Sequence, residues 1–170
     1  MASITIRNAV PSQDAEDACR VYSHFVLNSS ATFEEIPPTV SAMEALIRTT
    51  QDQRYPFLIA EVDGHFAGYA SAKLFYGRSG FSPTVEDSIY LDPAFHGQGV
   101  GHYLLGELVD RCRQRGIRNI LALIGGGPSN VGSTRLHEKH GFFLVGNVEK
   151  CGRKNGELRD MSILQLVLDS

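Results

Sequence analysis

The sequence predicts an α/β fold, a central mixed β-sheet with helices on its faces, formed by residues 1–170 as one domain. Apolar segments of strand type alternate with segments that show the 3.6-residue period of amphipathic helices. No Ser/Gly-rich linker and no internal repeat divides the chain. A length of 170 residues also suffices to bury one complete hydrophobic core.

The first half of the chain is expected to contribute four strands and two helices. Ile4 and Ile6 alternate with polar residues, as in a strand with one buried face. Pro37-Pro38 separates the two helices, and Asp63-Gly64 is a typical hairpin turn between two strands. The expected elements are a strand at 4–7, helices at 12–28 and 41–53, and strands at 57–62, 66–74 and 85–91.

The second half is expected to contain two helices and three strands. A clear amphipathic helix follows the glycine-rich segment 96–101 and ends at Gly116, a residue suited to the left-handed position after a helix. Ser129 or Asn130 is expected to cap a second helix. The remaining elements are a strand at 120–124, that second helix ending at Gly141, and strands at 142–148 and 161–168 joined by a polar turn at 150–160.

Composition excludes several classes of function. A formal net charge of −3 gives no broad attraction to nucleic acid or to an anionic membrane. Cys19, Cys112 and Cys151 form no CxxC pair, so neither a disulfide framework nor a zinc site is expected. The N-terminus does not resemble a signal peptide, and no apolar run reaches the roughly 20 residues that span a bilayer. We therefore expect a soluble, cytoplasmic protein.

The glycine-rich loop HGQGVGHYLL is the most informative segment. It follows an apolar strand and opens a helix, so its free N–H groups suit an anion such as pyrophosphate. Gly97, Gly99 and Gly101 allow positive φ and close approach of the backbone. A dinucleotide motif would need glycine where His102 stands, and no Gly-Lys-Ser/Thr of a P-loop is present. The pattern therefore fits neither nucleotide motif.

The run IYLDPAFHGQGVGHYLL resembles the coenzyme A loop of the GCN5-related N-acetyltransferase (GNAT) superfamily, with His96 in place of the usual Gln or Arg. The run NVGSTRLHEKHGF resembles the second signature of the superfamily. Nearly the whole chain is similar to one branch, the phosphinothricin and methionine sulfoximine acetyltransferases. It departs from that branch at Leu158, where tryptophan is frequent. The matching residues of the two signatures are Gly99, Gly101, Asn130, Ser133, Leu136, Gly141 and Phe142.

This resemblance implies a GNAT-type fold, acetyl-coenzyme A (acetyl-CoA) as co-substrate and a small amine as acceptor. It also implies a homodimer. Asn130 is expected to bond the pantetheine arm, to cap its helix, or both. The residues implied to bind acetyl-CoA are Ile89, Tyr90, Leu91, Gly97, Gln98, Gly99, Val100, Gly101, His102, Asn130 and Ser133.

Glu86 is the predicted general base. Amide formation needs a neutral amine, and alkyl amines titrate near 10, as lysine does, so a group must accept a proton. Glu86 starts the strand that runs toward the glycine loop, and it matches the position of the branch's catalytic glutamate. The alternative for Glu86 is a solvated carboxylate at a strand end. Asp87 should point to the opposite face, because side chains alternate along a strand.

Two further groups are candidates for the chemistry. The resemblance places the oxyanion donor at a bulge in the strand at Ile89–Leu91, so the N–H of Leu91 is a candidate. The leaving thiolate has a pKa of around 8.5, by analogy with cysteine, and needs a hydrogen bond or a proton. His137 follows the conserved leucine of the second signature. It is a general acid, a second base, or only a polar helix residue near the coenzyme.

Arg78 is the candidate for binding a carboxylate or phosphinate of the substrate through its forked donors. The alternative is an exposed loop arginine. Phe33 and Phe81 are expected to wall the substrate pocket, although each equally fits a core residue. The other histidines show no metal-ligand spacing with carboxylates, so no metal is expected.

Three other functions stay open at this point. One is an acetyltransferase for protein N-termini or lysines. Another is a catalytically silent acetyl-CoA-binding sensor, which the presence of Glu86 and His137 disfavours. The last is a nucleotide-binding domain, which the glycine spacing disfavours.

Overall fold

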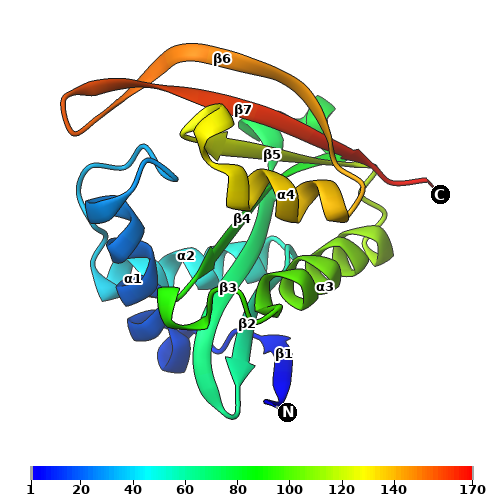
Figure 1. Ribbon diagram of the computed structural model, residues 1–170. Helices are drawn as coiled ribbons and strands as arrows, with labels where there is room; N and C mark the ends of the chain where they lie inside the picture. Colours follow the sequence, from blue (N-terminus) through cyan, green and yellow to red (C-terminus); the bar gives the residue numbers. More distant parts are fainter. Residues whose placement is uncertain (1, 170) are drawn as a thin grey trace.

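One mixed sheet forms the centre of the computed structural model, which describes residues 2–169 (Figure 1). Its strand order is β1-β2-β3-β4-β5-β7-β6. Only β4 and β5 run parallel, and every other neighbouring pair is antiparallel. The strands are β1 (Ile4–Asn8), β2 (Phe57–Val62), β3 (His65–Leu74), β4 (Thr84–Leu91), β5 (Asn119–Gly125), β6 (Phe143–Lys154) and β7 (Glu157–Val167).

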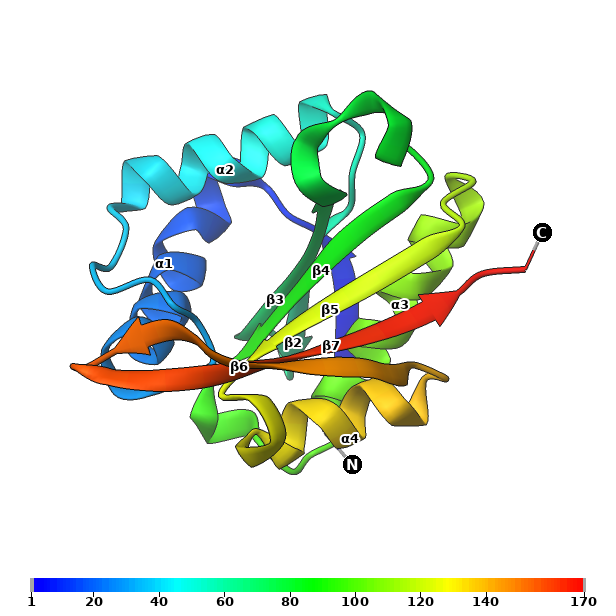
Figure 2. The ribbon, with the colours of Figure 1, turned by 90° about the horizontal axis from the view of Figure 1, so that it is seen from above.

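The helices lie on both faces of this sheet. Figure 2 shows α1 and α2 on one face and α3 and α4 on the other. This arrangement confirms the predicted α/β fold with a mixed sheet. No helix within residues 2–169 combines the length and the apolar character needed to cross a membrane. The α-helices are α1 (Pro11–Asn28), α2 (Val40–Asp52), α3 (Val100–Gln114) and α4 (Val131–Lys139).

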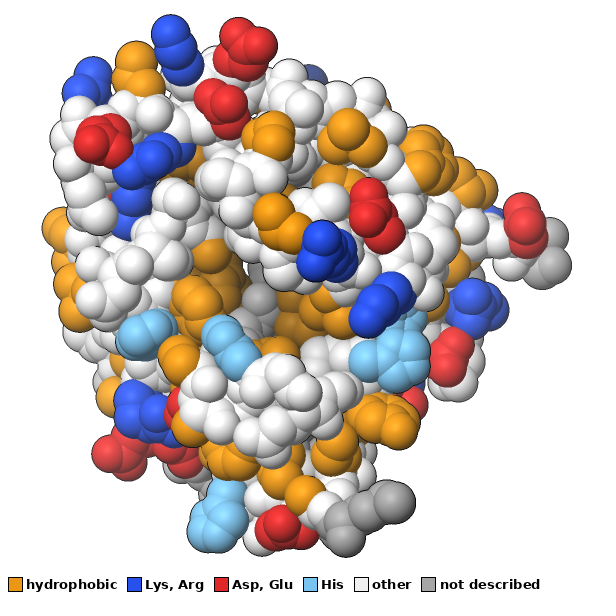
Figure 3. All heavy atoms as spheres, viewed as in Figure 1, with side chains coloured by type: hydrophobic (Ala, Val, Ile, Leu, Met, Phe, Trp, Pro, Cys, Tyr) orange, Lys and Arg blue, Asp and Glu red, His pale blue; other side chains and the backbone are white. Residues whose placement is uncertain are grey.

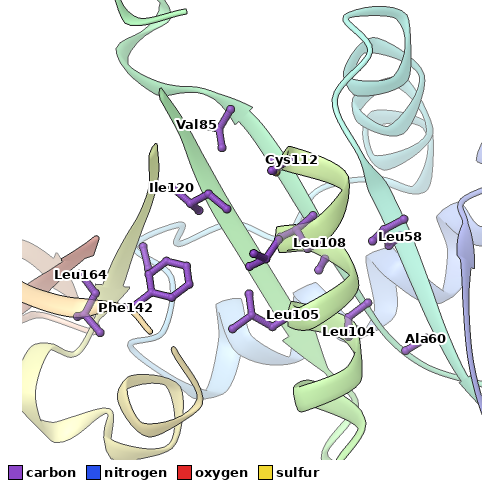
Figure 4. Packing of buried hydrophobic residues seen from close by; sticks show 14 of the residues in the cluster. Leu58, Ala60, Val85, Leu104, Leu105, Leu108, Cys112, Ile120, Phe142 and Leu164 are labelled. Atoms are coloured by element: carbon purple, nitrogen blue, oxygen red, sulfur yellow. The ribbon is translucent and has the colours of Figure 1, made fainter. Parts of the chain in front are cut away.

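Helix α3 anchors the larger of two hydrophobic clusters. Its residues Leu104, Leu105 and Leu108 share one face at helical spacing and are completely buried against the sheet (Figure 4). On the opposite face, α1 and α2 cover a smaller cluster that includes Met43 and Tyr69. Strand β4 lies between the two clusters, with Val85 buried in the larger one and Tyr90 packed against the smaller one.

The parallel pairing of β4 with β5 is unusually short. It joins only Thr84–Glu86 of β4 to Asn119–Leu121 of β5. The antiparallel pairing of β4 with β3, in contrast, continues to the pair Leu91–Gly68. Beyond Glu86, β4 therefore stays with β3 and diverges from β5, which opens a gap in the middle of the sheet.

The predicted polar turn at 150–160 is wrong. Strand β6 continues to Lys154 and β7 begins at Glu157, with irregular register between Val148 and Gly152. The turn itself is only Asn155-Gly156, with φ of 50° and 79°, the positive values of a two-residue hairpin turn. The residues of this hairpin end are polar because most of them are exposed, and that polarity conceals their strand structure.

Candidate active site

A cavity of about 770 Å³ occupies the gap between the diverging strands. Strand β4 forms one wall, β5 and the start of α4 form another, and the loop at 31–34 closes the side next to α1. The face of the molecule seen in Figure 3 is hollowed at its centre, with hydrophobic and histidine side chains around the hollow. Most residues predicted to act in the chemistry lie along this cavity.

The glycine loop forms a backbone cradle at one end of the cavity. Gly97 and Gly99 have φ of 75° and 83°, and Gly99 occupies the cap position of α3. Among the hydrogen bonds of residues 2–169, none uses the N–H groups of 97–101 as donors. A Cβ on Gly101 would lie 3.1 Å from Leu91 and 3.2 Å from Leu136. Free N–H groups at a helix N-terminus fit the pyrophosphate of acetyl-CoA.

The other residues of the loop have separate tasks. His96 bonds through Nε2 to the carbonyl oxygen of Leu91 at 3.1 Å, which fastens the loop to β4. Gln98 donates to the carbonyl of Ala94 at 3.0 Å. Val100 is completely buried, so only its backbone can face a ligand. The ring of His102 lies 4.7 Å from that of His140, centre to centre, outside the cavity lining.

The edge of β4 that faces the gap carries unpaired backbone groups. The N–H of Asp92 donates to Ala67 of β3 at 2.9 Å. Backbone direction alternates along an antiparallel strand, so the N–H groups of Ile89 and Leu91 point away from β3, into the gap. The expected bulge at Ile89–Leu91 is wrong, because the β3–β4 register is continuous there. Loss of the β5 partner exposes these groups without a bulge.

Glu86 lines the cavity from the sheet face that carries α1 and α2. Its directly opposite neighbour on β3 is Lys73, and Lys73 Nζ lies 3.6 Å from Glu86 Oε1. The Glu86 side chain is 21% exposed, so it is neither sealed in the core nor fully solvated. Tyr90 shares this face and packs edge-on against Tyr22 at 5.0 Å.

Asp87 points to the opposite face, as strand alternation predicts, and pairs with His137 of α4. His137 Nε2 lies 2.9 Å from Asp87 Oδ2, and its Nδ1 lies 2.7 Å from the carbonyl oxygen of Ser133. Burial lowers the pKa of His137, but the charge and hydrogen bond of Asp87 and the Ser133 carbonyl together raise it above 6.5. Both ring nitrogens face acceptors, which is the arrangement of an imidazolium that donates two hydrogen bonds.

Asn130 fixes the start of α4 beside the cavity. Its Oδ1 accepts from the N–H of Ser133 at 3.3 Å, and its Nδ2 donates to the carbonyl of Gly125 at 3.1 Å. The predicted capping role is therefore present. Ser133 Oγ lies 3.5 Å from His137 Nδ1, so the predicted Asn130 and Ser133 belong to the same assembly as His137.

Phe33 lines the cavity from the loop between α1 and α2. Its ring packs directly on Gly152 of β6, where no side chain could fit. Lys154 is buried beside it, and its Nζ donates to the carbonyls of Thr32 at 2.9 Å and of Glu34. Sequence reasoning missed Lys154, because it lies in the segment interpreted as a turn.

Arg78 and Phe81 lie in the segment between β3 and β4, outside the lining of the cavity. The guanidinium of Arg78 stacks over the ring of Tyr76 at 5.2 Å. The ring of Phe81 packs edge-on against Phe75 at 5.5 Å. The structure therefore does not bring these two residues together with Glu86 in this single chain. Residues 2–169 also contain no group of three His, Cys, Asp or Glu side chains placed to hold a metal ion.

The cradle at a helix N-terminus, next to a sheet that splits at its parallel pair, defines the class of protein. The chain belongs to the acetyltransferase (GNAT) family, which matches residues 20–142. It is an acetyl-CoA-dependent N-acetyltransferase.

Individual relatives match nearly the whole chain. Phosphinothricin N-acetyltransferase of Alcaligenes faecalis is 36% identical over 98% of this chain and 83% of its own. L-methionine sulfoximine/L-methionine sulfone acetyltransferase of Salmonella typhimurium is 34% identical over 98% and 95%. A solved acetyltransferase from Salmonella typhimurium with its cofactor acetyl-CoA has a TM-score of 0.94 at 33% identity, covering 99% of this chain and 95% of its own.

Proposed function

We propose that this protein transfers the acetyl group of acetyl-CoA to the amine of a small amino-acid-like substrate. The substrate would be of the phosphinothricin, methionine sulfoximine or methionine sulfone type, and the attack would be direct, without an acyl-enzyme. One observation carries the proposal, namely that Glu86 lines the cavity into which the free edge of β4 opens. The activities of the relatives described above support the substrate type.

In this proposal the chain holds the donor through its backbone. The free N–H groups of 97–101 bind the pyrophosphate, and the unpaired edge of Ile89–Leu91 hydrogen-bonds the amide groups of the pantetheine arm. Asn130 and Ser133 shape the wall beside the arm through the start of α4. Side-chain charge contributes little here, which is compatible with His96 in place of Gln or Arg.

Glu86 then accepts the proton of the amine, directly or through water. Its partial exposure gives it a path for returning that proton to solvent. The N–H of Leu91 points into the same gap and donates to the carbonyl oxygen of the thioester as negative charge develops on it. The C–S bond then breaks, and the coenzyme A thiolate leaves and takes up a proton from water. Both nitrogens of His137 are engaged by Asp87 and Ser133, so we assign His137 a positioning role in α4.

We further propose that the protein acts as a cytoplasmic homodimer. Strand β6 is at the sheet edge and exposes Phe143, Leu144 and Val145, each more than half exposed in the single chain. Exposed apolar groups at a sheet edge favour association. Sedimentation equilibrium measures the mass, and a monomer at micromolar concentration would contradict the dimer.

The acceptor class is tested by an amine screen with acetyl-CoA and detection of the released thiol. Methionine sulfone, methionine sulfoximine and phosphinothricin are compared with peptides that carry free N-termini or lysines. We expect thiol release with the amino-acid analogues. Turnover of peptides alone would favour a protein acetyltransferase, and tight acetyl-CoA binding without turnover of any amine would favour a sensor.

A further inference from the structure

The charges around the cavity are unevenly distributed. Glu34, Glu86 and Asp87 line it, whereas Lys73 is the one lysine or arginine among its lining residues in the described part of the chain. Arg78 is directed onto Tyr76 instead. The imidazolium of His137 also lines the cavity, but it is already bonded to Asp87. An anionic group that enters this cavity therefore meets one lysine or arginine side chain, and that lysine lies beside the proposed base.

Lys73 and Glu86 form a pair of opposite charges with a defined direction. They are directly opposite each other on β3 and β4, and Nζ lies 3.6 Å from Oε1. An α-amino acid also carries opposite charges on one carbon. Its amine nitrogen and carboxyl carbon are about 2.5 Å apart, as standard bond lengths and angles dictate. A zwitterion can therefore lie along the pair with its ammonium toward Glu86 and its carboxylate toward Lys73.

The contact between Lys73 and Glu86 can be replaced by contacts with a substrate at little loss of free energy. The Lys73 side chain is 63% exposed, and an ion pair between exposed side chains contributes little to stability because water screens it. A flexible lysine stem also lets the ammonium move by a short distance to meet a carboxylate. The pair is therefore compatible with opening when a substrate enters.

We propose that Lys73 binds the α-carboxylate of the substrate and so selects α-amino acids over amines that lack this group. This inference rests on the proposed function, because it assigns one part of the same substrate. The carboxylate contact places the amine next to Glu86. Arg78 stays a candidate for a second anionic group, such as a phosphinate on the substrate side chain.

The test compares two substrates, methionine sulfone and 3-(methylsulfonyl)propan-1-amine, which lacks the carboxylate. We expect the Lys73→Met variant to raise the KM for methionine sulfone by about 10- to 100-fold, the range for a lost hydrogen bond between charged groups. The KM for the simple amine and the KM for acetyl-CoA should change less than about twofold, since neither involves this contact. Lys73→Arg should keep most of the preference for methionine sulfone. As a control, Lys150→Met removes one exposed positive charge outside the cavity.

Three outcomes would overturn the inference. One is an equal loss on both substrates in Lys73→Met, which would mean that Lys73 acts on Glu86 alone. Another is no change on either substrate. The third is a wild-type enzyme that acetylates the simple amine as efficiently as methionine sulfone, which would leave the proposed acetyl transfer intact. Failure of the proposed function looks different, because the wild type would then acetylate neither compound.

Discussion

Two neighbouring carboxylates on β4 lie in opposite environments. Glu86 faces α1 and α2, is 21% exposed, and has an exposed partner in Lys73. Asp87 faces α4, is 2% exposed, and is held by a buried His137 at 2.9 Å. The alternation of side chains along one strand separates the two groups completely. Two adjacent acidic residues thus differ in access to solvent, and this difference suits one for proton transfer and the other for holding the structure.

The same contrast extends to the partners. Lys73 is exposed and can leave Glu86 to contact a substrate group, whereas both ring nitrogens of His137 are bonded to groups of the protein. Breaking a buried ion pair leaves an uncompensated charge, and breaking an exposed pair leaves two hydrated ones. Substitutions at the two positions should therefore act on different measured quantities.

The largest effect is expected for Glu86→Gln, which keeps the shape of the side chain and removes the base. We expect kcat to fall by about 10²- to 10⁴-fold, the usual contribution of general base catalysis. The free energy of unfolding should stay within about 0.5 kcal/mol of the wild type. Steady-state thiol release and urea unfolding measure the two quantities. Full activity in Glu86→Gln would remove Glu86 as the base and with it the contrast between the two carboxylates.

Asp87→Asn, in contrast to Glu86→Gln, should lower the free energy of unfolding strongly. This variant leaves His137 without its negative partner in a buried site, which costs about 3–5 kcal/mol. Urea unfolding measures the loss, and Glu86→Gln is the matched control on the same strand. A loss below about 1 kcal/mol would be close to the effect of an ordinary surface substitution and would contradict the structural role of Asp87.

The smallest effect is a pH dependence. The folded protein raises the pKa of His137 above 6.5, so the stability from this group is complete below pH 6.5 and is lost as pH rises through the folded pKa. Without Asp87, burial outweighs the remaining hydrogen bond to the Ser133 carbonyl and lowers the pKa of His137, so the sign reverses. The stability difference between wild type and Asp87→Asn should therefore narrow as pH rises from below 6.5 through the folded pKa of His137, by about 1.4 kcal/mol per unit of difference between the two folded pKa values.

Urea unfolding of both proteins across that pH range measures this narrowing. The same comparison in proteins that also carry His137→Asn serves as the reference. Because the titrating group is then absent, the effect of Asp87→Asn on stability should no longer depend on pH. A difference in the free energy of unfolding between wild type and Asp87→Asn that grows with pH would contradict an imidazolium at His137.

Local patterns explain which features were predictable. The glycine loop, the cap at Asn130 and the opposite directions of Glu86 and Asp87 each depend on a few consecutive residues. The mixed sheet followed from the order of apolar segments. The hairpin turn at Asn155-Gly156 was also visible locally, but the polarity of its surroundings suggested a longer turn.

Other features depend on partners distant in the sequence. The pairing of Asp87 with His137 joins residues 50 positions apart, and no spacing rule indicates it. The free edge at Ile89–Leu91 arises because β5 departs from β4, so the backbone needs no bulge and leaves no local signal. Such properties are determined by tertiary structure alone.

The contact between Lys154 and Thr32 spans 122 residues, and it has a consequence for biosynthesis. The cradle at 97–101 and strand β4 leave the ribosome well before Lys154 is added. A nascent chain that ends before Lys154 has no donor for the carbonyls of Thr32 and Glu34, and one that ends before Gly152 has no surface for the Phe33 ring. Contacts of such long separation are costly to close and form late. During synthesis the residues of the coenzyme cradle are therefore available before the contacts that hold the loop at 31–34 against β6 can form.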